Sequence, residues 1–361
     1  MAIPTLPTPT GAHPVGTTSI HLQDVSRPDP WVADVPTREL MISIWYPTAR
    51  PSGPRARYLT RAESEKVLAG QQAIPPDALS SVRTHAFPDA PLDPGLRELP
   101  LIVLSPGFTR PRASLTSIGE DLASHGYVAV AIDHTHETAA TAFPDGRVAA
   151  FALGRDFPRT PEFWHKVKTG RARDASFVLD QLLGSNPPWA GAAGLAPDRI
   201  GMAGHSAGGA ATIAAMLADE RIRAGGNVDG STDPLIPDTG LDRPFLFLGR
   251  DGQYSPGDGP AADTWARDWT LLTGWKRWLV VAGAKHPSFT DLGLLADQLG
   301  MPLGAATSGS RTMTITRTYL RAFFDRHLRD AEHPPFDHLN AEHPEVRCCL
   351  PPDRPADSGS R

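Results

Sequence analysis

The sequence predicts an α/β fold with a doubly wound, mostly parallel sheet and helices on both of its faces. Strand-like and helix-like segments alternate along most of the chain. Residues 99–105 and 127–133 are nearly continuous apolar runs, which is typical of strands buried on both faces of a parallel sheet. A glycine-rich turn then joins a strand-like segment at 199–204 to an alanine-rich, helix-like segment at 207–218. Together these three observations favour parallel strands connected by helical crossovers.

The order of the elements along the chain supports one sheet in one domain. The expected strands are 17–25, 39–46, 99–105, 127–133, 199–204, 224–228, 244–249 and 278–282. The expected helices are 62–70, 114–125, 162–183, 207–218 and 311–328, and Gly126 is placed to cap the second of them. We therefore expect an N-terminal extension over 1–30, a single α/β domain over 31–330 and a proline-rich tail over 331–361.

Charge and composition argue against several classes of partner and location. The formal net charge is −5, from 35 basic and 40 acidic side chains, and no block of like charge favours a nucleic acid or an anionic membrane. No run approaches 18 apolar residues, so we expect no integral membrane segment. The first residues lack a basic region followed by an apolar run, so we expect no secretory signal and a cytoplasmic location. The two cysteines, Cys348 and Cys349, are adjacent and poorly placed to bridge each other.

The turn Gly204-His205-Ser206-Ala207-Gly208 matches the G-x-S-x-G pattern of a nucleophilic serine. The match gains specificity from its context, since it follows a predicted strand and begins a predicted helix. A serine on such a tight turn has strained backbone angles, and the flanking glycines avoid clashes that side chains would cause. The helix N-terminus adds positive potential for a developing oxyanion. The motif therefore predicts the α/β-hydrolase fold with Ser206 as the nucleophile.

A serine hydroxyl needs a base, and in this fold the acid and the histidine follow the serine in that order. His286 follows the last predicted strand, on a loop at its carboxyl end, where the base belongs. Two aspartates are candidates for the acid. Asp229 ends the strand after the nucleophile helix, and Asp251 ends the next strand, which is the commoner acid position. Spacing alone does not separate the two.

Two further groups of polar residues have weaker functional interpretations. His134, His136 and Glu137 could form part of a metal site, but no cluster of further ligands accompanies them, so we expect no metal. Arg171 and Arg173 are interpreted as a solvated helix face.

Several apolar or aromatic residues are candidates for a substrate pocket. Phe108 and Phe289 adjoin predicted catalytic positions, and His205 lies inside the nucleophile motif. Five tryptophans could either line an acyl pocket or pack helices onto the sheet, namely Trp164, Trp265, Trp269, Trp275 and Trp278.

Longer segments of the chain resemble the platelet-activating-factor acetylhydrolase family and, more widely, the actinobacterial lipases and cutinase-like polyester hydrolases. The resemblance covers roughly residues 38–295. It rests on LPLIVLSPGFTRPRASLTSIGEDLASHGYVAVAIDHTHETAATAF, on GHSAGG, on NVDG and on KHPSFTD. Pro106 departs from the acetylhydrolases, which carry histidine there. The segment Ser105-Pro106-Gly107-Phe108 is more similar to the corresponding segment of the cutinase-like relatives.

This resemblance implies a serine esterase of the α/β-hydrolase fold. Acetylhydrolases place the acid where Asp229 stands and cutinase-like relatives where Asp251 stands, and we favour Asp229. The resemblance also implies an oxyanion hole built from the backbone N–H groups of Phe108 and Ala207, in agreement with the general rule for this fold. We expect hydrolysis of a small-molecule or lipid-like carboxylic ester through an acyl-enzyme, with no cofactor. The alternatives are a biosynthetic tailoring hydrolase, thioesterase or lactonase, and a non-catalytic binding protein, against which the complete Ser-Asp-His set argues.

Overall fold

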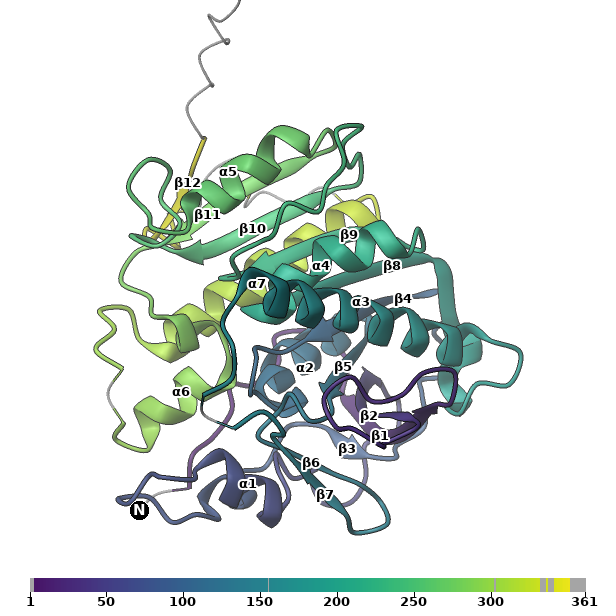
Figure 1. Cartoon of the computed structure of the whole chain (residues 1–361). Helices are drawn as coiled ribbons and strands as arrows, with labels where there is room; N and C mark the ends of the chain where they lie inside the picture. Colours follow the sequence, from purple (N-terminus) through teal and green to yellow (C-terminus); the bar gives the residue numbers. More distant parts are fainter. Residues whose placement is uncertain (1–2, 155, 302, 332–335, 337–340, 351–361) are drawn as a thin grey trace, which may run out of the picture.

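The computed structural model describes residues 3–154, 156–301, 303–331, 336 and 341–350, and it contains a ten-stranded sheet (Figure 1). The strand order is β12-β11-β10-β9-β8-β4-β5-β2-β1-β3. The central strands run parallel to one another: β4 (Leu99–Ser105), β5 (Val128–His134), β8 (Leu195–His205), β9 (Ile222–Val228), β10 (Phe245–Arg250) and β11 (Lys276–Val281). Their carboxyl ends meet at one edge of the sheet, where sites assemble in α/β proteins. The predicted doubly wound, mostly parallel sheet is confirmed.

Antiparallel pairing extends the sheet at both sides. Strand β2 (Arg38–Pro47) runs antiparallel to β5 and to β1 (Val15–Asp24), which also pairs with the short β3 (Phe87–Pro88). The range 1–30, expected to be an extension, thus includes a strand that pairs with β2 along its whole length. At the other side β12 (Val346–Cys348) pairs with β11. Of the expected tail, residues 332–335, 337–340 and 351–361 lie outside the described residues.

Helices cover both faces of the sheet (Figure 1). The helices α3 (Pro161–Leu183), α4 (Ala207–Ala218) and α5 (Ala262–Leu271) pack on one face. On the other face lie α2 (Thr116–Ser124) and α7 (Gly309–Leu328), with α6 (Asp291–Gln298) against α7. The connecting elements are α1 (Arg61–Val67), β6 (Ala140–Ala142), β7 (Val148–Ala150), η1 (Ala78–Ser81), η2 (Arg112–Leu115), η3 (Ala190–Gly194) and η4 (His286–Phe289), where η marks a 3-10 turn.

Alternate side chains of the central strands form two hydrophobic clusters, one on each face of the sheet. In β4, Leu101 and Val103 belong to the cluster under α3 and α4, whereas Ile102 and Leu104 belong to the cluster under α2 and α7. All four are at most 1% exposed. This burial on both faces explains why the strand is a continuous apolar run rather than an alternating one. Burying each such side chain stabilises the fold by about 1.5–3 kcal/mol.

The buried elements next to the site match the sequence prediction most closely. Strand β4 and helix α4 have the predicted bounds, and Gly126, with a φ of 84°, follows α2 as a left-handed residue, as expected of a cap. Helices α5 and α6 and the strands β3, β6, β7 and β12 were not expected from the sequence. Each is short, so its apolar residues span too few turns or pairs to establish a period.

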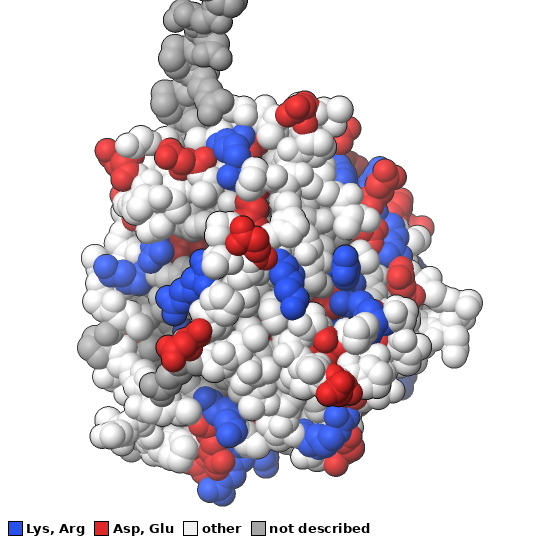
Figure 2. All heavy atoms as spheres, viewed as in Figure 1, with Lys and Arg blue, Asp and Glu red and all other residues white. Residues whose placement is uncertain are grey.

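Two further observations concern the partners that were expected from the sequence. Within the described part of the chain, no helix combines the length and the apolar character needed to cross a bilayer. On the face shown in Figure 2, acidic and basic side chains are interspersed. This mixing is what a sequence without blocks of like charge predicts.

Candidate active site

Ser206 lies on a sharp turn between β8 and α4, with a φ of 57° and a ψ of −121°. The turn is possible because its glycines bring backbone segments into close contact. A Cβ on Gly204 would lie 2.4 Å from the carbonyl carbon of Gly208, and a Cβ on Gly208 would lie 2.0 Å from the carbonyl oxygen of Ser105. The end of β4 is therefore packed directly against the first turn of α4. This geometry raises Ser206 above the carboxyl edge of the sheet.

Three side chains form a continuous hydrogen-bonded line at this edge. The hydroxyl of Ser206 lies 2.9 Å from Nε2 of His286, and Nδ1 of the same ring lies 2.5 Å from Oδ2 of Asp229. His286 begins η4, after β11, and Asp229 follows β9. The Asp229 side chain is fully buried, whereas that of His286 is 38% exposed. The line thus runs from a buried carboxylate through a ring to an accessible hydroxyl, the order that a nucleophilic serine requires.

The orientation of Asp229 is set by the neighbouring strand. Asp229 has a φ of 56°, which turns its side chain back across the edge of the sheet. The backbone N–H of Arg250, at the end of β10, donates to Oδ1 at 2.8 Å, and Nε of Arg250 lies 3.3 Å from Oδ2. One carboxylate oxygen is thereby held by the backbone while the other accepts from His286.

Asp251, the other candidate acid, makes different contacts. Its carboxylate accepts hydrogen bonds from the hydroxyl of Ser255, from the backbone N–H of Gly252 at 3.0 Å and from Nη2 of Arg347 at 2.5 Å. Three donors thus hold the side chain within its own turn and against β12. Of the two candidates, Asp229 is the one hydrogen-bonded to His286.

The loop after β4 lies beside Ser206. A Cβ on Gly107 would be 3.4 Å from Cβ of Ser206, so the backbone of this loop touches the serine. The backbone N–H groups of Phe108 and Ala207 donate to no protein acceptor within the described residues. Two amides without an acceptor, one in the loop that touches Ser206 and one directly after Ser206, are thus available as the expected oxyanion donors.

A cavity of about 460 Å³ opens onto Ser206 and His286. One wall comes from the first turns of α3, and the opposite wall from the segments that follow β9 and β10. The lining residues are Arg159, Pro161, Trp164, Lys168, Ser206, Ala207, Asp229, Ser231, Thr232, Asp233, Arg250, Gln253, Tyr254 and His286. Lys168 and Asp233 form an ion pair across the cavity, with Nζ and Oδ1 2.5 Å apart. The lining therefore mixes charged and polar side chains with apolar surface, which includes the rings of Trp164 and Tyr254.

Phe108 packs against a group of aromatic side chains, one of which, Trp164, lines the cavity. The ring of Phe108 contacts those of Phe157, Phe163 and Trp164, with centroids 5.2–5.7 Å apart. Of the five tryptophans considered above, Trp164 lines the cavity. Trp265 and Trp278 belong to the core on the α3 side, because both are fully buried.

Phe289 and His205, expected from the sequence to line a pocket, do not line this cavity, and both are buried. Phe289 is fully buried in the cluster under α2 and α7, so it packs the η4 turn rather than the cavity. His205 is also buried, and its Nε2 donates to the backbone carbonyl of His286 at 2.8 Å. Burial, reinforced by the neighbouring His286, holds the pKa of His205 well below its usual range. The ring is thus a neutral donor that supports the backbone of His286.

The three residues that could form a metal site by their sequence, His134, His136 and Glu137, have other partners. Nε2 of His134 accepts a hydrogen bond from the hydroxyl of Ser105 at 2.8 Å, and its Nδ1 donates to Oδ2 of Asp174 at 2.7 Å. Both hydrogen bonds are buried. Oε1 of Glu137 accepts from Nε1 of Trp31 at 2.9 Å.

Another group of ligand-type side chains gathers around the hydrogen bond between His286 and Asp229. Among the described residues, one set of His, Cys, Asp or Glu has ligand atoms within 4.8 Å of one another, formed by His205, Asp229 and His286. His286 and Asp229 already hydrogen-bond each other, and His205 donates to a carbonyl. These bonds suit proton transfer better than metal coordination.

Arg171 was misinterpreted from the sequence. It is 1% exposed and pairs with Glu137, whereas Arg173 is exposed as expected. Helical spacing places Trp164, Lys168 and Arg171 on one face of α3, at i, i+4 and i+7, but it does not show what lies against that face. The first two of these residues line the cavity.

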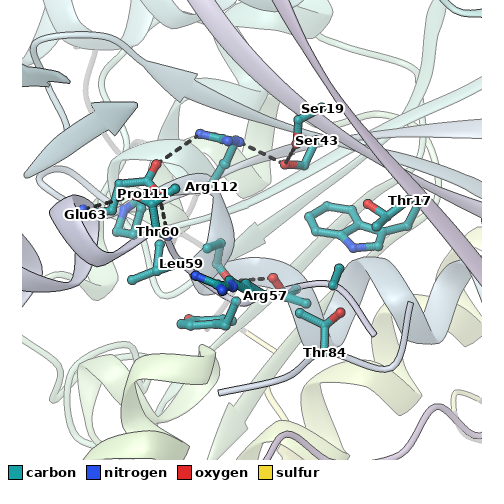
Figure 3. A pocket seen from close by; sticks show the side chains of 15 residues that line it. Thr17, Ser19, Ser43, Arg57, Leu59, Thr60, Glu63, Thr84, Pro111 and Arg112 are labelled. Atoms are coloured by element: carbon teal, nitrogen blue, oxygen red, sulfur yellow. Dashed lines mark hydrogen bonds and ion pairs between the residues drawn. The ribbon is translucent and has the colours of Figure 1, made fainter. Parts of the chain in front are cut away.

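A second cavity, of about 180 Å³, lies beside β1 and β2. Figure 3 shows the side chains that line it. Arg112, four residues after Phe108, lies in its wall. The Arg112 guanidinium donates to Oγ of Ser43 at 2.8 Å and to the carboxylate of Asp133, and its Nη1 lies 3.7 Å from Oε1 of Glu63. These contacts join the segment after Phe108 to β2, β5 and α1.

Known proteins show similarity to this chain. Residues 5–152 match the family model described as platelet-activating factor acetylhydrolase, isoform II. A probable 1-alkyl-2-acetylglycerophosphocholine esterase of Arthroderma benhamiae is 28% identical over 269 residues, covering 69% of this chain and 65% of that protein. A platelet-activating factor acetylhydrolase of Cavia porcellus is 24% identical over 242 residues, covering 58% and 52% respectively. The chain thus spans about half to two thirds of the length of these curated relatives.

A solved structure extends the likeness to nearly the whole chain. The ferulic acid esterase from Streptomyces cinnamoneus is 39% identical, with a TM-score of 0.86, and the match covers 96% of this chain and 99% of that one. The chain belongs to the α/β-hydrolase esterase family. The resemblance to acetylhydrolases inferred from the sequence is confirmed by the family model and the curated relatives. In this esterase-family chain Ser206, Asp229 and His286 follow β8, β9 and β11. Strands β8 and β9 are neighbours in the parallel part of the sheet, and β10 lies between β9 and β11.

Proposed function

We propose that this esterase-family chain hydrolyses carboxylic esters, with Ser206 as nucleophile, His286 as general base and Asp229 as the acid of the triad. The proposal is carried by the hydrogen-bonded line of 2.9 Å and 2.5 Å that joins the three side chains. The buried carboxylate, the half-exposed ring and the cavity that opens onto the serine support the same assignment.

The proposed reaction proceeds through an acyl-enzyme. Nε2 of His286 takes the hydroxyl proton while Oγ of Ser206 attacks the carbonyl carbon of the ester. The carboxylate of Asp229 orients the ring and stabilises the imidazolium that forms. The amides of Phe108 and Ala207 donate to the oxyanion of the tetrahedral intermediate. His286 then protonates the leaving alcohol, and water activated by the same ring releases the acid.

Two acyl classes are candidates for the substrate. The names of the curated relatives point to acetyl esters of a lipid-like alcohol. A second candidate is an aromatic acyl group, as in the ferulic acid esterase. The aromatic candidate is favoured by Trp164, which lines the cavity and packs edge-on against Phe108 with centroids 5.3 Å apart. A planar acyl group could pack on this surface close to the proposed oxyanion hole.

A fluorophosphonate probe and a panel of esters test the proposal. The wild-type protein should be labelled at Ser206, and Ser206→Ala should lose both labelling and turnover, with a fall in kcat on the order of 10⁶. Comparing p-nitrophenyl acetate, p-nitrophenyl hexanoate and methyl ferulate identifies the acyl class. Faster cleavage of a thioester or lactone than of every ester would favour the tailoring hydrolase, thioesterase or lactonase alternative. An unlabelled, inactive wild-type protein would favour the binding-protein alternative and end the proposal.

A further inference from the structure

We infer that Arg171 and Glu137 form a buried clamp that positions the backbone N–H of Phe108 for the oxyanion. The inference rests on the proposed function and adds a pair of positioning residues to it. We do not place either side chain in contact with the substrate. Their effect is exerted through the loop 105–109.

Arg171 holds the loop on the side that precedes Phe108. Its Nη1 donates to the carbonyl of Pro106 and to Oγ of Ser105, the latter at 3.3 Å. Its Nε donates to Oε2 of Glu137 at 2.7 Å. The side chains of Arg171 and Glu137 are 1% and 2% exposed, so the guanidinium is shielded from water and its hydrogen bonds are with the protein.

Glu137 holds the loop on the side that follows Phe108. Its backbone carbonyl accepts from the N–H of Thr109 at 2.8 Å, and the N–H of Ala139 donates back to the carbonyl of Thr109 at 3.1 Å. The carboxylate of Glu137 is itself held by Nε1 of Trp31 at 2.9 Å. Phe108 therefore lies between two tethered peptide groups, and both tethers converge on Glu137.

A clamp of this kind has a physical reason. An oxyanion donor accelerates a reaction only if it already points at the place where charge develops. The Phe108 amide belongs to a loop without a helix or strand to hold it, so its direction depends on contacts to its flanks. A buried ion pair contributes little net stability compared with apolar packing, but it fixes geometry at its partners. Arg171 donates to the carbonyl of Pro106, in the loop that touches Ser206, and this contact is consistent with such a role.

Arg38 provides a matched control in the same buried region. It is also 1% exposed, and it pairs with Asp174 at 2.8 Å and Asp29 at 2.9 Å. Its bond to the backbone goes to the carbonyl of Thr135, not to the loop of Phe108. Arg38 reaches the loop 105–109 only through Asp174 and His134, which contacts the hydroxyl of Ser105. Loss of Arg38 should therefore disturb packing and ion pairing but leave the bond from Arg171 to the carbonyl of Pro106 in place.

The first experiment compares Arg171→Met with Arg38→Met on a small p-nitrophenyl ester. We expect Arg171→Met to lower kcat by about 10- to 100-fold, less than complete loss of an oxyanion donor, with KM within threefold of wild type. Affinity for a trifluoromethyl ketone, which mimics the tetrahedral intermediate, should fall in parallel. Arg38→Met should leave kcat within threefold. Equal losses in the two variants, or an unchanged kcat in Arg171→Met, would overturn the inference.

Two further variants guard against misfolding. The double variant Arg171→Met/Glu137→Gln leaves no unpaired buried charge and should show the same loss of kcat as Arg171→Met. Arg171→Lys keeps the charge but cannot reach both Pro106 and Glu137, so it should recover only part of the activity. Full activity in the double variant contradicts the clamp.

A measurement that needs no turnover separates this inference from the proposed function. Hydrogen–deuterium exchange of the peptide spanning 105–110 should accelerate at least tenfold in Arg171→Met and stay near wild type in Arg38→Met. If the wild-type protein cleaves no ester but this exchange result is obtained, the proposed function fails and the clamp stands. If exchange is unchanged in Arg171→Met, the clamp is wrong whatever the activity.

Discussion

The backbone N–H of Arg250 donates to Oδ1 of Asp229 at 2.8 Å, so the acid of the proposed triad is oriented by the strand next to its own. The other oxygen is left for His286. Asp229→Asn keeps the shape and the left-handed backbone but removes the charge that fixes the ring. By analogy with the same change in a well-studied triad, we expect kcat to fall by about 10⁴ with little change in KM.

The control for the acid is Asp251→Asn. This change weakens a surface contact with Arg347, which is worth at most about 1 kcal/mol, and it leaves the line to His286 intact. We expect kcat to stay within threefold of wild type. If steady-state kinetics show the larger loss in Asp251→Asn, Asp251 is the acid.

His205 offers a test of support from behind the catalytic ring. His205→Phe removes the donor to the carbonyl of His286 and leaves that carbonyl unsatisfied, which costs about 1–3 kcal/mol. We expect kcat to fall about tenfold. His205→Gln retains an N–H that can reach the same carbonyl, and it should recover most of the activity. Similar kcat values in the two variants would show that the hydrogen bond is unimportant.

Two helical glycines should respond in opposite ways to alanine. A Cβ on Gly208 would lie 2.0 Å from the carbonyl oxygen of Ser105, so Gly208→Ala must displace the backbone at the nucleophile. We expect a loss of about 3 kcal/mol in the free energy of unfolding and a large fall in kcat. A Cβ on Gly170, within α3, would meet nothing within 4 Å, so Gly170→Ala should stabilise the fold by about 1 kcal/mol. Urea denaturation of both variants measures the two effects, and a shared sign would contradict the packing argument.

Stability should fall as the pH rises from about 4 to about 8 because of two buried acids. Burial raises the pKa of Glu120 to about 8 and that of Asp291 to about 7, and the charge of Asp291 adds to the shift of Glu120. Both pKa values are higher in the folded than in the unfolded chain, so the stabilisation is complete below pH 4 and is lost as the pH rises through 7 to 8. The midpoint of thermal unfolding should therefore decrease between pH 6 and pH 9.

Glu120→Gln is the variant that tests this dependence. Its side chain is neutral at every pH, so the decrease in the unfolding midpoint between pH 6 and pH 9 should be smaller than in wild type. The exposed Glu65 supplies the control, and Glu65→Gln should keep the wild-type dependence. If Glu120→Gln loses as much stability as wild type over this range, the raised pKa of Glu120 is not responsible.

Local sequence signals were sufficient to predict the fold and two of the three hydrogen-bonded residues, Ser206 and His286. The apolar run of β4 and the alanine-rich helix α4 have the bounds that the sequence predicts, because burial on both faces and helical spacing are properties of neighbouring residues. The motif around Ser206 predicts its own turn, since its glycines are required by contacts within that turn and with β4. The strand order of the chain then places His286 on the expected loop.

Only the tertiary structure decided which of these residues meet. Asp229 and Asp251 both end parallel strands, and their difference comes from a φ of 56° at Asp229 and from the donors that hold Asp251 in its own turn. Arg171 looks like a surface residue in the sequence, because helical spacing does not say what lies against a face. Its partner Glu137 is 34 residues away, and the loop that it holds is more than 60 residues away. Such pairings depend on how separate elements pack, and a local pattern of residue types carries no information about them.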